Sequence, residues 1–282
     1  MIRLRLSGAK RSLVVLSLAL AGCGTPLPAS NPTPEAYTLR LITDNASAPL
    51  LYDLVSAYTS TRALIVWDIQ VSDGAAVADW LQAGRAPYAF WGMLPDAVNN
   101  APDYWLAPVG IGGVAFVVHP TNTVSDLSPD QVRNILSGRI VNWAELGGAD
   151  RPIVVVARGE SSTEGQLVQR IVLGDRRIRP DARLALTGKA LIDLVAEEPG
   201  AAGFVSVGYL SSAVRPLALE GIPPTPQTLG EETYPLRSPI VIAGLEAPGD
   251  DAYRAFFAWV QSPAGQAVVQ AQHGGIPAVE RP

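Results

Sequence analysis

Runs of Val, Ile and Leu that alternate with helical patterns constrain this chain more than any other feature. "YTLRLIT" (37–43) and "ALIVWDIQV" (63–71) are typical of buried strands, and "APLLYDLVSAYTS" (48–60) between them carries apolar residues at helical spacing. The alternation continues to two closing helical patterns, "DDAYRAFFAWVQ" (250–261) and "SPAGQAVVQAQHGG" (262–275). We therefore expect an α/β fold with largely parallel sheets.

One helix is specified by its end signals. In "SPDQVRNILSG" (128–138), Ser128 is a good N-cap and Pro129 suits the first helical position. Gln131 completes a capping box, and Gly138 is a typical helix end. We expect a short helix between these residues.

The N-terminal 22 residues have the pattern of a secretory signal. A basic start precedes the apolar run "SLVVLSLALAG" (12–22), which is too short to span a bilayer comfortably. "LAGC" (20–23) resembles the lipobox of bacterial lipoproteins, which implies cleavage before Cys23 and a lipid on its thiol. The alternatives are an ordinary signal peptide or an uncleaved anchor. In each case the protein works outside the cytoplasmic membrane.

The segment after the signal reads as a tether. Residues 24–36, "GTPLPASNPTPEA", contain four prolines and no apolar periodicity, so residues 23–36 are expected to be an extended, lipidated link to the membrane. Cys23 is the only cysteine of the chain, so no internal disulfide can form.

Composition argues against several functions. A formal net charge of −5 argues against nucleic acid as a partner. The chain has two histidines, His119 and His273, with no metal-ligand spacing and no serine–histidine pairing. We expect no enzyme, no metal and no other cofactor.

"RGESSTEG" (158–165) permits two interpretations. Ser161 followed by Glu164 fits a capping box, which would only start a helix. Alternatively, Arg158 beside a hydroxyl-rich helix N-terminus offers hydrogen-bond donors to an oxyanion. The strand-like "RPIVVVAR" (151–158) leads into this stretch, and strand, loop and helix N-terminus is an arrangement in which α/β proteins place ligands.

Several stretches occur in an order that belongs to a known family. They include a Leu-Ser-x-x-Gln helix followed by Asn-Trp, an Arg followed by a Ser/Thr-rich turn, a Pro-Gly-Ala segment before a strand, and Tyr-Pro-Leu. The stretches are "SDLSPDQVRNILSGRIVNWAELGG" (125–148), "RGESSTEG" (158–165), "PGAAGFVSVGYL" (199–210), "LEGIPPTPQTLGEETYPLRSPIVI" (219–242) and "FFAWVQSPAGQAVV" (256–269). With them the chain resembles the phosphate-binding proteins of bacterial ABC phosphate importers, in the type II periplasmic-binding-protein superfamily.

The resemblance implies two lobes, each with a mainly parallel sheet flanked by helices, joined by two hinge crossings with the ligand between them. Lobe 1 would be residues 37–109 and 235–282, and lobe 2 residues 110–234. It also implies an extracytoplasmic, monomeric solute-binding lipoprotein that captures a small oxyanion, phosphate above others, and passes it to an ABC permease in the membrane.

The resemblance also implies ligand-binding residues. In "DNASAPL" (44–50), Asn45 falls on the family's ligand threonine and Ala46 on a backbone N–H donor, while Ser72 falls on a ligand serine. Each of these positions is also an ordinary cap or turn residue. The full expected set is Asn45, Ala46, Ser47, Ser72, Arg158, Ser161, Ser162 and Thr163.

Three departures from the family pattern concern the ligand. Gly92 stands where the family has an aspartate that accepts the proton of hydrogen phosphate, and Ser162 replaces a glycine of the family's Ser-Gly-Thr. Glu160 and Glu164 bracket the motif, where a carboxylate competes with a bound anion; Glu164 could cap its helix or face the cleft. The alternative is therefore a drifted binding module or sensor for a different, possibly organic or non-phosphate, ligand without a transport role.

Overall fold

The computed structural model describes residues 37–60, 64–92 and 104–276 of the 282-residue chain. These residues belong to one compact unit, Ala36–Pro282. The predicted signal peptide, the lipidated Cys23 and the Pro-rich tether lie outside the described residues.

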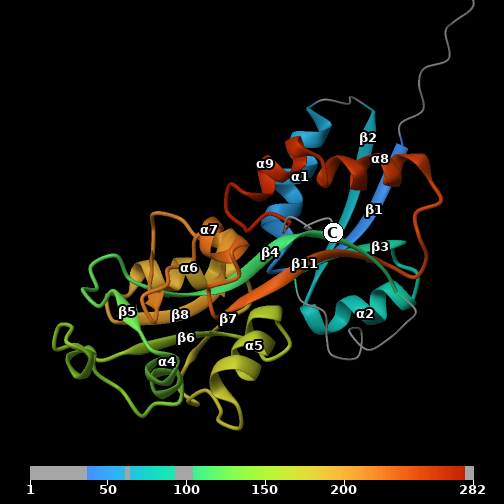
Figure 1. Cartoon of the computed structure of the whole chain (residues 1–282). Coiled ribbons are helices and arrows are strands. Elements are labelled where there is room, and N and C mark those ends of the chain that lie inside the picture. The colour runs from blue at the N-terminus through green and yellow to red at the C-terminus, as the bar shows by residue number, and fades with distance from the viewer. Residues whose placement is uncertain (1–36, 61–63, 93–103, 277–282) are drawn as a thin grey trace, which may run out of the picture. The chain divides into compact units, whose positions relative to one another are not determined.

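The fold begins with three parallel strands and two helices, as the alternation of patterns predicts (Figure 1). Strand β1 pairs with β2 on one side and with β3 on the other, both in parallel. The elements are β1 (Tyr37–Asp44), α1 (Ala48–Thr59), β2 (Ile65–Ser72), α2 (Gly74–Gln82) and β3 (Tyr88–Trp91).

Two long strands run through the middle of the sheet. β4 (Trp105–Val118) pairs antiparallel with β11 (Arg237–Gly244) along its first part and with β8 (Ala201–Ser206) along its last part. Because β4 spans 14 residues, it is long enough to serve both partners in sequence. The strand order of the sheet is β2-β1-β3-β11-β4-β8-β6-β7, with β6 at Val154–Arg158 and β7 at Arg183–Ala185. Within the described sheet, β11 and β4 therefore connect the two ends.

The chain between β4 and β11 forms the other end of the sheet, where β6 pairs in parallel with β7 and β8. Its strands are β5 (Asp126–Leu127), β6 (Val154–Arg158), β7 (Arg183–Ala185), β8 (Ala201–Ser206), β9 (Arg215–Pro216) and β10 (Ala218–Leu219). Its helices are α4 (Pro129–Leu136), η1 (Trp143–Leu146), α5 (Thr163–Val168), η2 (Gln169–Leu173), α6 (Gly188–Glu197), η3 (Val207–Tyr209) and α7 (Pro226–Gly230). The chain closes with α8 (Asp251–Val260) and α9 (Pro263–Val269).

The sheet differs in one respect from two separate, mainly parallel sheets. Apart from β5 and β10, which pair with each other in a separate two-stranded sheet, the described strands form one continuous mixed sheet that is parallel at both ends and antiparallel in the middle. The sheet is continuous because β4, with 14 residues, pairs with β11 along its first part and with β8 along its last part.

The predicted caps of α4 are confirmed. The Ser128 hydroxyl accepts a hydrogen bond from the Gln131 N–H at 3.2 Å, and the Gln131 side-chain oxygen accepts one from the Ser128 N–H at 2.8 Å. Gly138, just after the helix, has φ +76°, a conformation that glycine adopts without strain. Local sequence therefore fixes this helix.

The buried side chains fall into clusters that divide the fold in two. Leu41 and Ile42, neighbours on β1, belong to different clusters because side chains alternate across a strand: Leu41 packs with α1 and α8, and Ile42 with α2. A third cluster runs from Val114 to Leu236. We call the part around the first two clusters (described residues 37–109 and 240–276) the first half, and the part around the third (114–236) the second half.

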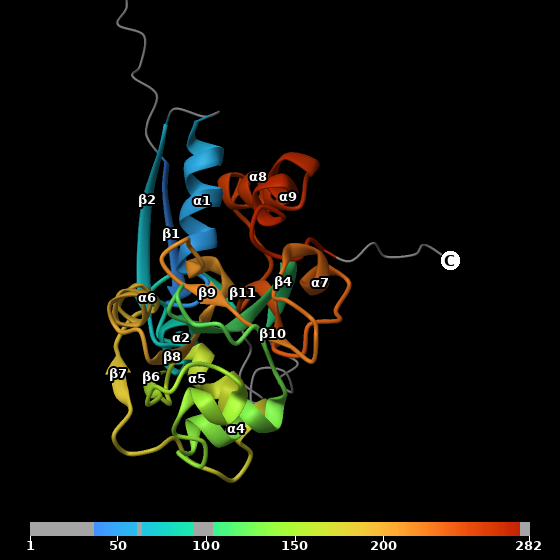
Figure 2. The same ribbon diagram turned by 90° about the vertical axis from the view of Figure 1, so that its left-hand side faces the viewer.

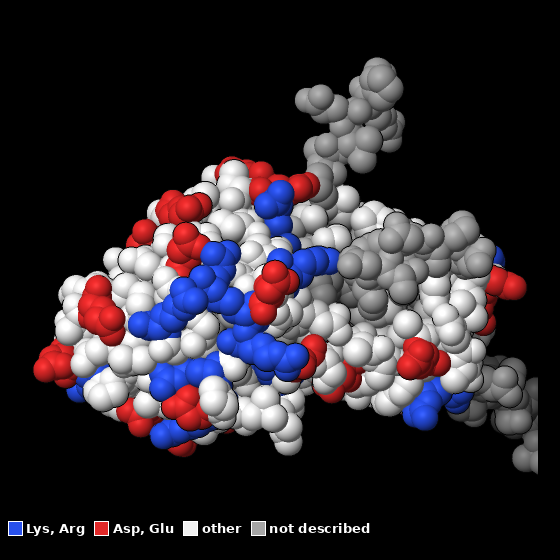
Figure 3. All heavy atoms as spheres, turned by 90° about the horizontal axis from the view of Figure 1, so that it is seen from below, with Lys and Arg blue, Asp and Glu red and all other residues white. Residues whose placement is uncertain are grey.

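Figures 1 and 2 agree on the placement of the helices. α1, α8 and α9 lie with β1 and β2 in the first half, and α4 and α5 lie at the opposite end in the second half. Seen from below, Lys and Arg side chains gather over the second half (Figure 3). In the second half, α4 and the loop after η2 bring three arginines near one another, since they bond to Val172, Asn134 and Leu136: Arg133, Arg176 and Arg179. None of the described helices is both long enough and apolar enough to cross a bilayer.

Candidate functional site

The loop between β1 and α1 contacts the second half through a buried carboxylate. Asp44, the last residue of β1, is fully buried. Its Oδ1 accepts a hydrogen bond from the Ser47 N–H at 2.7 Å, and its Oδ2 accepts one from the Gly92 N–H at 3.1 Å. The Thr163 hydroxyl, from the second half, donates to Oδ2 at 2.6 Å. Three donors from three separate segments therefore converge on one carboxylate.

The electrostatics of Asp44 follow from this burial. Burial raises the pKa of the Asp44 carboxyl above its usual range, and the Thr163 hydroxyl opposes that change by donating to the charged form. A buried carboxylate of this kind is costly unless it is hydrogen-bonded. The Thr163 hydroxyl of the second half therefore adds a third donor to the two N–H donors that the first half supplies.

Asn45, the next residue, is also held by the second half. Its side-chain oxygen Oδ1 accepts hydrogen bonds from Arg158 Nη2 at 3.2 Å and from the Gly188 N–H at 2.9 Å. The Tyr209 hydroxyl donates to the Asn45 backbone oxygen at 2.8 Å. Gly188 is the first residue of α6, so Asn45 lies at the N-terminus of that helix.

Arg158 ends β6 and is 2% exposed. One guanidinium nitrogen, Nη1, donates to the Ala185 oxygen at 2.7 Å, and Nη2 donates to Asn45. Nε lies 3.5 Å from Glu164 Oε1. Protein oxygens therefore accept hydrogen bonds from both terminal nitrogens of the predicted cation.

Glu164 is fully buried beside this guanidinium. Burial raises the pKa of the Glu164 carboxyl, and the charge of Arg158 lowers it in part. Removing one partner of a fully buried ion pair strongly destabilises the protein, because the other partner is left as an unpaired buried charge. The pair ties the start of α5 to the end of β6.

The predicted capping box of Ser161 and Glu164 is wrong. Ser162 is the N-cap of α5: its hydroxyl accepts from the Gly165 N–H at 3.0 Å and donates to the Gly159 oxygen at 2.7 Å. The Ser161 hydroxyl instead donates to Asp73 Oδ2 at 2.7 Å, at an exposed contact between the halves. Glu164 does not cap the helix because it is drawn to Arg158.

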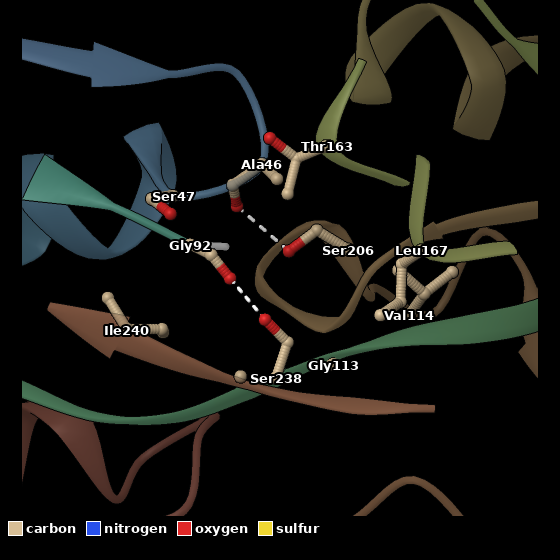
Figure 4. A pocket seen from close by; sticks show the side chains of 11 residues that line it. Ala46, Ser47, Gly92, Gly113, Val114, Thr163, Leu167, Ser206, Ser238 and Ile240 are labelled. Atoms are coloured by element: carbon tan, nitrogen blue, oxygen red, sulfur yellow. Dashed lines mark hydrogen bonds between the residues drawn. The ribbon is translucent and has the colours of Figure 1, made fainter. Parts of the chain in front are cut away.

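A small cavity, lined by both hydroxyl and apolar groups, lies between the two halves (Figure 4). Its volume is about 20 Å³, room for about one water molecule. The Ser206 hydroxyl donates to the Ala46 oxygen at 2.8 Å, and the Ser238 hydroxyl donates to the Gly92 oxygen. The lining residues are Ala46, Ser47, Gly92, Gly112, Gly113, Val114, Thr163, Leu167, Ser206, Ser238 and Ile240.

The expected ligand residues are distributed unevenly around this cavity. Ala46, Ser47 and Thr163 line it. Asn45 and Ser72 line a neighbouring, more open hollow of about 530 Å³, where the Ser72 hydroxyl donates to the Asp73 oxygen at 3.0 Å. Arg158, Ser161 and Ser162 line neither.

The structure adds residues that the sequence analysis missed. Asp44, Gly188, Ser206, Tyr209 and Ser238 all bond within the site. Asp44 alone had a sequence signal, since a polar residue at the carboxyl end of a parallel strand is where α/β proteins place ligand-binding groups. Ser206, Tyr209 and Ser238 lie in stretches that carry the family resemblance, but no local signal marks them or Gly188 as partners of the β1–α1 loop.

Gly92 has a structural reason of its own. A Cβ at this position would lie 2.3 Å from Ser47 Oγ and 3.4 Å from Asp44 Oδ2. A side chain here would therefore clash with the Ser47 hydroxyl and would only touch the Asp44 carboxylate. In this chain the carboxylate at this point of the site comes from the end of β1.

The two histidines lie apart from these contacts. His273 is 1% exposed, and burial lowers its pKa to about 4. His119 Nδ1 lies 2.8 Å from the Thr121 hydroxyl on an exposed turn. Within the described ranges, no three His, Cys, Asp or Glu side chains are grouped so that they could hold a metal ion.

Comparisons with known proteins agree with one another. The family model described as "PBP superfamily domain" matches residues 95–264, more than half of the chain. The phosphate-binding protein PstS of Bacillus subtilis is 30% identical over 129 residues, which cover 45% of this chain and 43% of that protein. PstS of Borreliella burgdorferi is 21% identical over 168 residues, which cover 56% of this chain and 60% of that protein. The chain thus spans about half the length of the curated relatives it matches.

Solved structures confirm the fold class. A putative phosphate ABC transporter substrate-binding protein from Clostridium perfringens, with bound phosphate, superposes with a TM-score of 0.78 at 22% identity, covering 85% of this chain and 99% of that one. An ABC-type phosphate transport receptor from Vibrio cholerae gives a TM-score of 0.69 at 22% identity, covering 85% and 100%. At this level of identity the similarity shows a shared α/β fold of the type II periplasmic-binding-protein kind.

Proposed function

This chain belongs to the PBP superfamily, and we propose that it is an extracytoplasmic solute-binding protein that captures a small oxyanion, phosphate above others, for an ABC importer. Curated relatives and solved structures with this fold are described as phosphate-binding proteins or phosphate transport receptors. Their names supply the ligand class, and the donors of this chain make it chemically reasonable.

The observation that carries the proposal is a set of hydrogen-bond donors on the second half that all face the β1–α1 loop. A guanidinium, a helix N-terminal N–H and hydroxyl groups are the donors that oxyanions use. The donors are Arg158 Nη2, Thr163 Oγ1, the Gly188 N–H, Ser206 Oγ and the Tyr209 hydroxyl.

Entry of a ligand requires the two halves to separate. The described cavity of about 20 Å³ is too small for a tetrahedral oxyanion with its own donors. We propose that the predicted lobes, residues 37–109 with 235–282 and residues 110–234, open by a hinge in β4 and β11, where they are joined. In the opened protein the donors of the second half would be free for a ligand.

The expected location and partners complete the proposal. A lipid on Cys23 and the tether of residues 23–36 would hold the protein at the outer face of the membrane, within reach of an ABC permease. The proposed protein acts as a monomer, binds no nucleic acid, and needs no catalysis because the ligand is passed on unchanged.

The primary test is calorimetric titration of the chain from residue 24 onward with phosphate, sulfate, molybdate and a panel of neutral solutes. We expect saturable heat with phosphate. Heat with a neutral solute and with no oxyanion would leave the fold but remove the assignment.

A matched pair of substitutions then tests the donors. Arg158→Lys keeps the positive charge and loses the planar fork, so phosphate binding should weaken by about tenfold or more. Arg177→Lys is the same change at an exposed arginine and should leave the affinity unchanged. Equal affinities for the two variants would contradict a role for the Arg158 guanidinium.

One observation favours a second candidate, a binding module or sensor for an organic oxyanion. The neighbouring hollow of about 530 Å³ is lined in part by apolar groups of Tyr52, Val71 and Leu186, next to Asn45. Such a hollow would suit the organic part of a phosphate ester better than inorganic phosphate. Titration with phosphate esters beside phosphate distinguishes the two ligands.

A further inference from the structure

The Asn45 side chain occupies donors that suit an anion. Arg158 Nη2 and the Gly188 N–H both point at its Oδ1, at 3.2 and 2.9 Å. One of these donors is cationic, and the other lies at the N-terminus of a 10-residue helix, where the backbone carries a partial positive charge. The acceptor that fills this position is a neutral amide oxygen of the protein itself.

The N-terminus of α6 leaves the Gly188 N–H open to an acceptor from outside the helix. A Cβ at position 188 would lie 2.4 Å from the Tyr209 ring, so only glycine allows this N–H and the ring to approach together. The Thr187 hydroxyl caps α6 through the Ala190 N–H at 3.1 Å and does not take the Gly188 N–H. The Gly188 N–H is thus left for a group that comes from across the halves.

A buried cation is the second, independent feature of this position. Arg158 is 2% exposed, and its nearest carboxylate is Glu164, whose Oε1 lies 3.5 Å from Nε. Nη2, next to Nε on the same edge of the guanidinium, donates to the neutral Asn45 amide oxygen at 3.2 Å. A charged acceptor there would form a shorter and stronger hydrogen bond than an amide does.

Two backbone oxygens of the β1–α1 loop also accept hydrogen bonds from the second half. The Tyr209 hydroxyl donates to the Asn45 backbone oxygen, and Ser206 Oγ donates to the Ala46 oxygen. Burial raises the pKa of Tyr209 to about 12, so its hydroxyl remains a neutral donor at physiological pH. Oxygen acceptors of the β1–α1 loop thus fill the donors of the second half.

We propose that Asn45 is a built-in competitor of the ligand: its amide oxygen holds the donors of Arg158 and Gly188 in the ligand-free protein, and the bound oxyanion displaces it. This inference rests on the proposed function and concerns the regulation of the same site. It assigns Asn45 a role opposite to that of a ligand contact, which the sequence resemblance implies.

The two roles predict effects of opposite sign. If Asn45 donates to the ligand, its truncation weakens binding. If Asn45 competes, the ligand can bind only to molecules in which Asn45 has left the donors. The measured affinity is then the intrinsic affinity multiplied by the fraction of ligand-free molecules in that state. Truncation then removes the competitor and tightens binding.

The test compares three variants of the chain from residue 24 onward by calorimetric titration with inorganic phosphate. Asn45→Ala should bind about tenfold more tightly than the wild type, the effect of about two net hydrogen bonds. Asn45→Asp, which places a carboxylate on the same donors, should bind more weakly. Asn122→Ala, a half-buried asparagine in the turn after β4, is the control and should bind with wild-type affinity.

Small-angle X-ray scattering supplies a readout that does not depend on affinity. Ligand-free Asn45→Ala should have a larger radius of gyration than the ligand-free wild type, because contacts between the halves are lost, and phosphate should bring the two to the same value. A circular dichroism spectrum like that of the wild type shows that the variant is folded.

The outcomes separate the two proposals. Wild type that binds phosphate while Asn45→Ala binds equally or more weakly overturns the competitor role and leaves the proposed function standing. Binding by Asn45→Ala alone supports the competitor role in its strongest form. No binding of any oxyanion by either protein overturns the proposed function and, with it, this inference.

Discussion

The two halves of the protein contribute opposite kinds of groups to the contacts around Asp44 and the β1–α1 loop, although elsewhere the Ala75 N–H of the first half donates to the Ser161 backbone oxygen at 3.2 Å. The first half offers acceptors: the Asp44 carboxylate, the Asn45 amide oxygen and the Ala46 backbone oxygen. The second half offers donors, among them Arg158 and Thr163. An anion supplies acceptor oxygens, so it can replace the acceptors of the first half but not the donors of the second. Under the proposed function, this difference assigns the recognition of an oxyanion to the second half and the competition with it to the first.

The cores of the halves differ as well. Rings pack against one another in the first half, for example Trp67 on Phe256 with centroids 4.8 Å apart and Tyr88 on Phe257 at 5.0 Å. The cluster of the second half consists mostly of Val, Leu, Ile and Ala. Each half therefore has its own core, and the polar contacts between them can change without exposing either core.

The largest effect should come from removing the main donor. Arg158→Ala leaves Glu164 as a buried, unpaired carboxylate, so we expect a loss of about 3–5 kcal/mol in the free energy of unfolding, together with loss of phosphate binding. Urea denaturation followed by circular dichroism measures the first, and calorimetry the second.

The double variant Arg158→Ala/Glu164→Gln separates these two effects. It should recover much of the stability, because no unpaired charge remains, and should still fail to bind phosphate. Recovery of binding in the double variant would show that Arg158 acts only on the fold.

The next effect should come from the donor that serves Asp44. Thr163→Val keeps the shape of the side chain and removes the hydroxyl at 2.6 Å from the carboxylate, so we expect a loss of about 2–3 kcal/mol in the free energy of unfolding. Ser161→Ala, two residues earlier, removes an exposed hydroxyl and should change stability by less than about 0.5 kcal/mol. Similar losses in the two variants would contradict the importance of the buried donor.

Acid should weaken the protein at the junction of the halves. His273 Cε1 lies 3.3 Å from the Cβ position of Gly208 in the second half. Its folded pKa of about 4 lies below the unfolded value of 6.5, so the unfolded state binds the proton first, and stability falls as the pH drops from 6.5 towards 4. The loss between pH 7 and 4.5 should be about 2 kcal/mol.

The wild type must be compared with a variant to isolate this effect. Burial raises the pKa of Asp44 and Glu164, and their contribution has the opposite sign: it is present at low pH and lost as the pH rises. His273→Gln should lack the acid loss assigned to the histidine, whereas His119→Gln, at an exposed turn, should keep it. Equal pH profiles for His273→Gln and the wild type would exclude His273 as the cause.

The smallest effect should come from a substitution in the first half, at Gly92 beside the Asp44 carboxylate. Gly92→Ala would place a Cβ 2.3 Å from Ser47 Oγ, which the serine side chain can relieve by rotating, so we expect a loss of about 1 kcal/mol in the free energy of unfolding. Thermal or urea unfolding measures this change, with Gly249→Ala, whose Cβ would meet nothing within 4 Å, as the control. No loss at Gly92 would show that the position tolerates a side chain beside Asp44.

Sequence patterns predicted most of the elements because these depend on neighbouring residues. The strand pattern of residues 37–43 became β1 (Tyr37–Asp44), and the capping signals around Ser128 produced α4. The prediction failed at α5, where Ser161 and Glu164 satisfy the local rule for a capping box. Ser162 caps the helix instead, since Glu164 pairs with Arg158 from the preceding strand.

The sequence by itself determined the α/β class, the helix caps that depend on adjacent residues, and the presence of an arginine beside a hydroxyl-rich helix start. Only the tertiary structure decided what those groups bond to, because Asp44 and Thr163, or Asn45 and Gly188, are more than 100 residues apart in the chain. Hydrogen bonds over such separations depend on the packing of two cores, and no local pattern encodes that packing. This is why the sequence could single out Arg158, but could not show that the protein's own oxygens accept hydrogen bonds from its guanidinium.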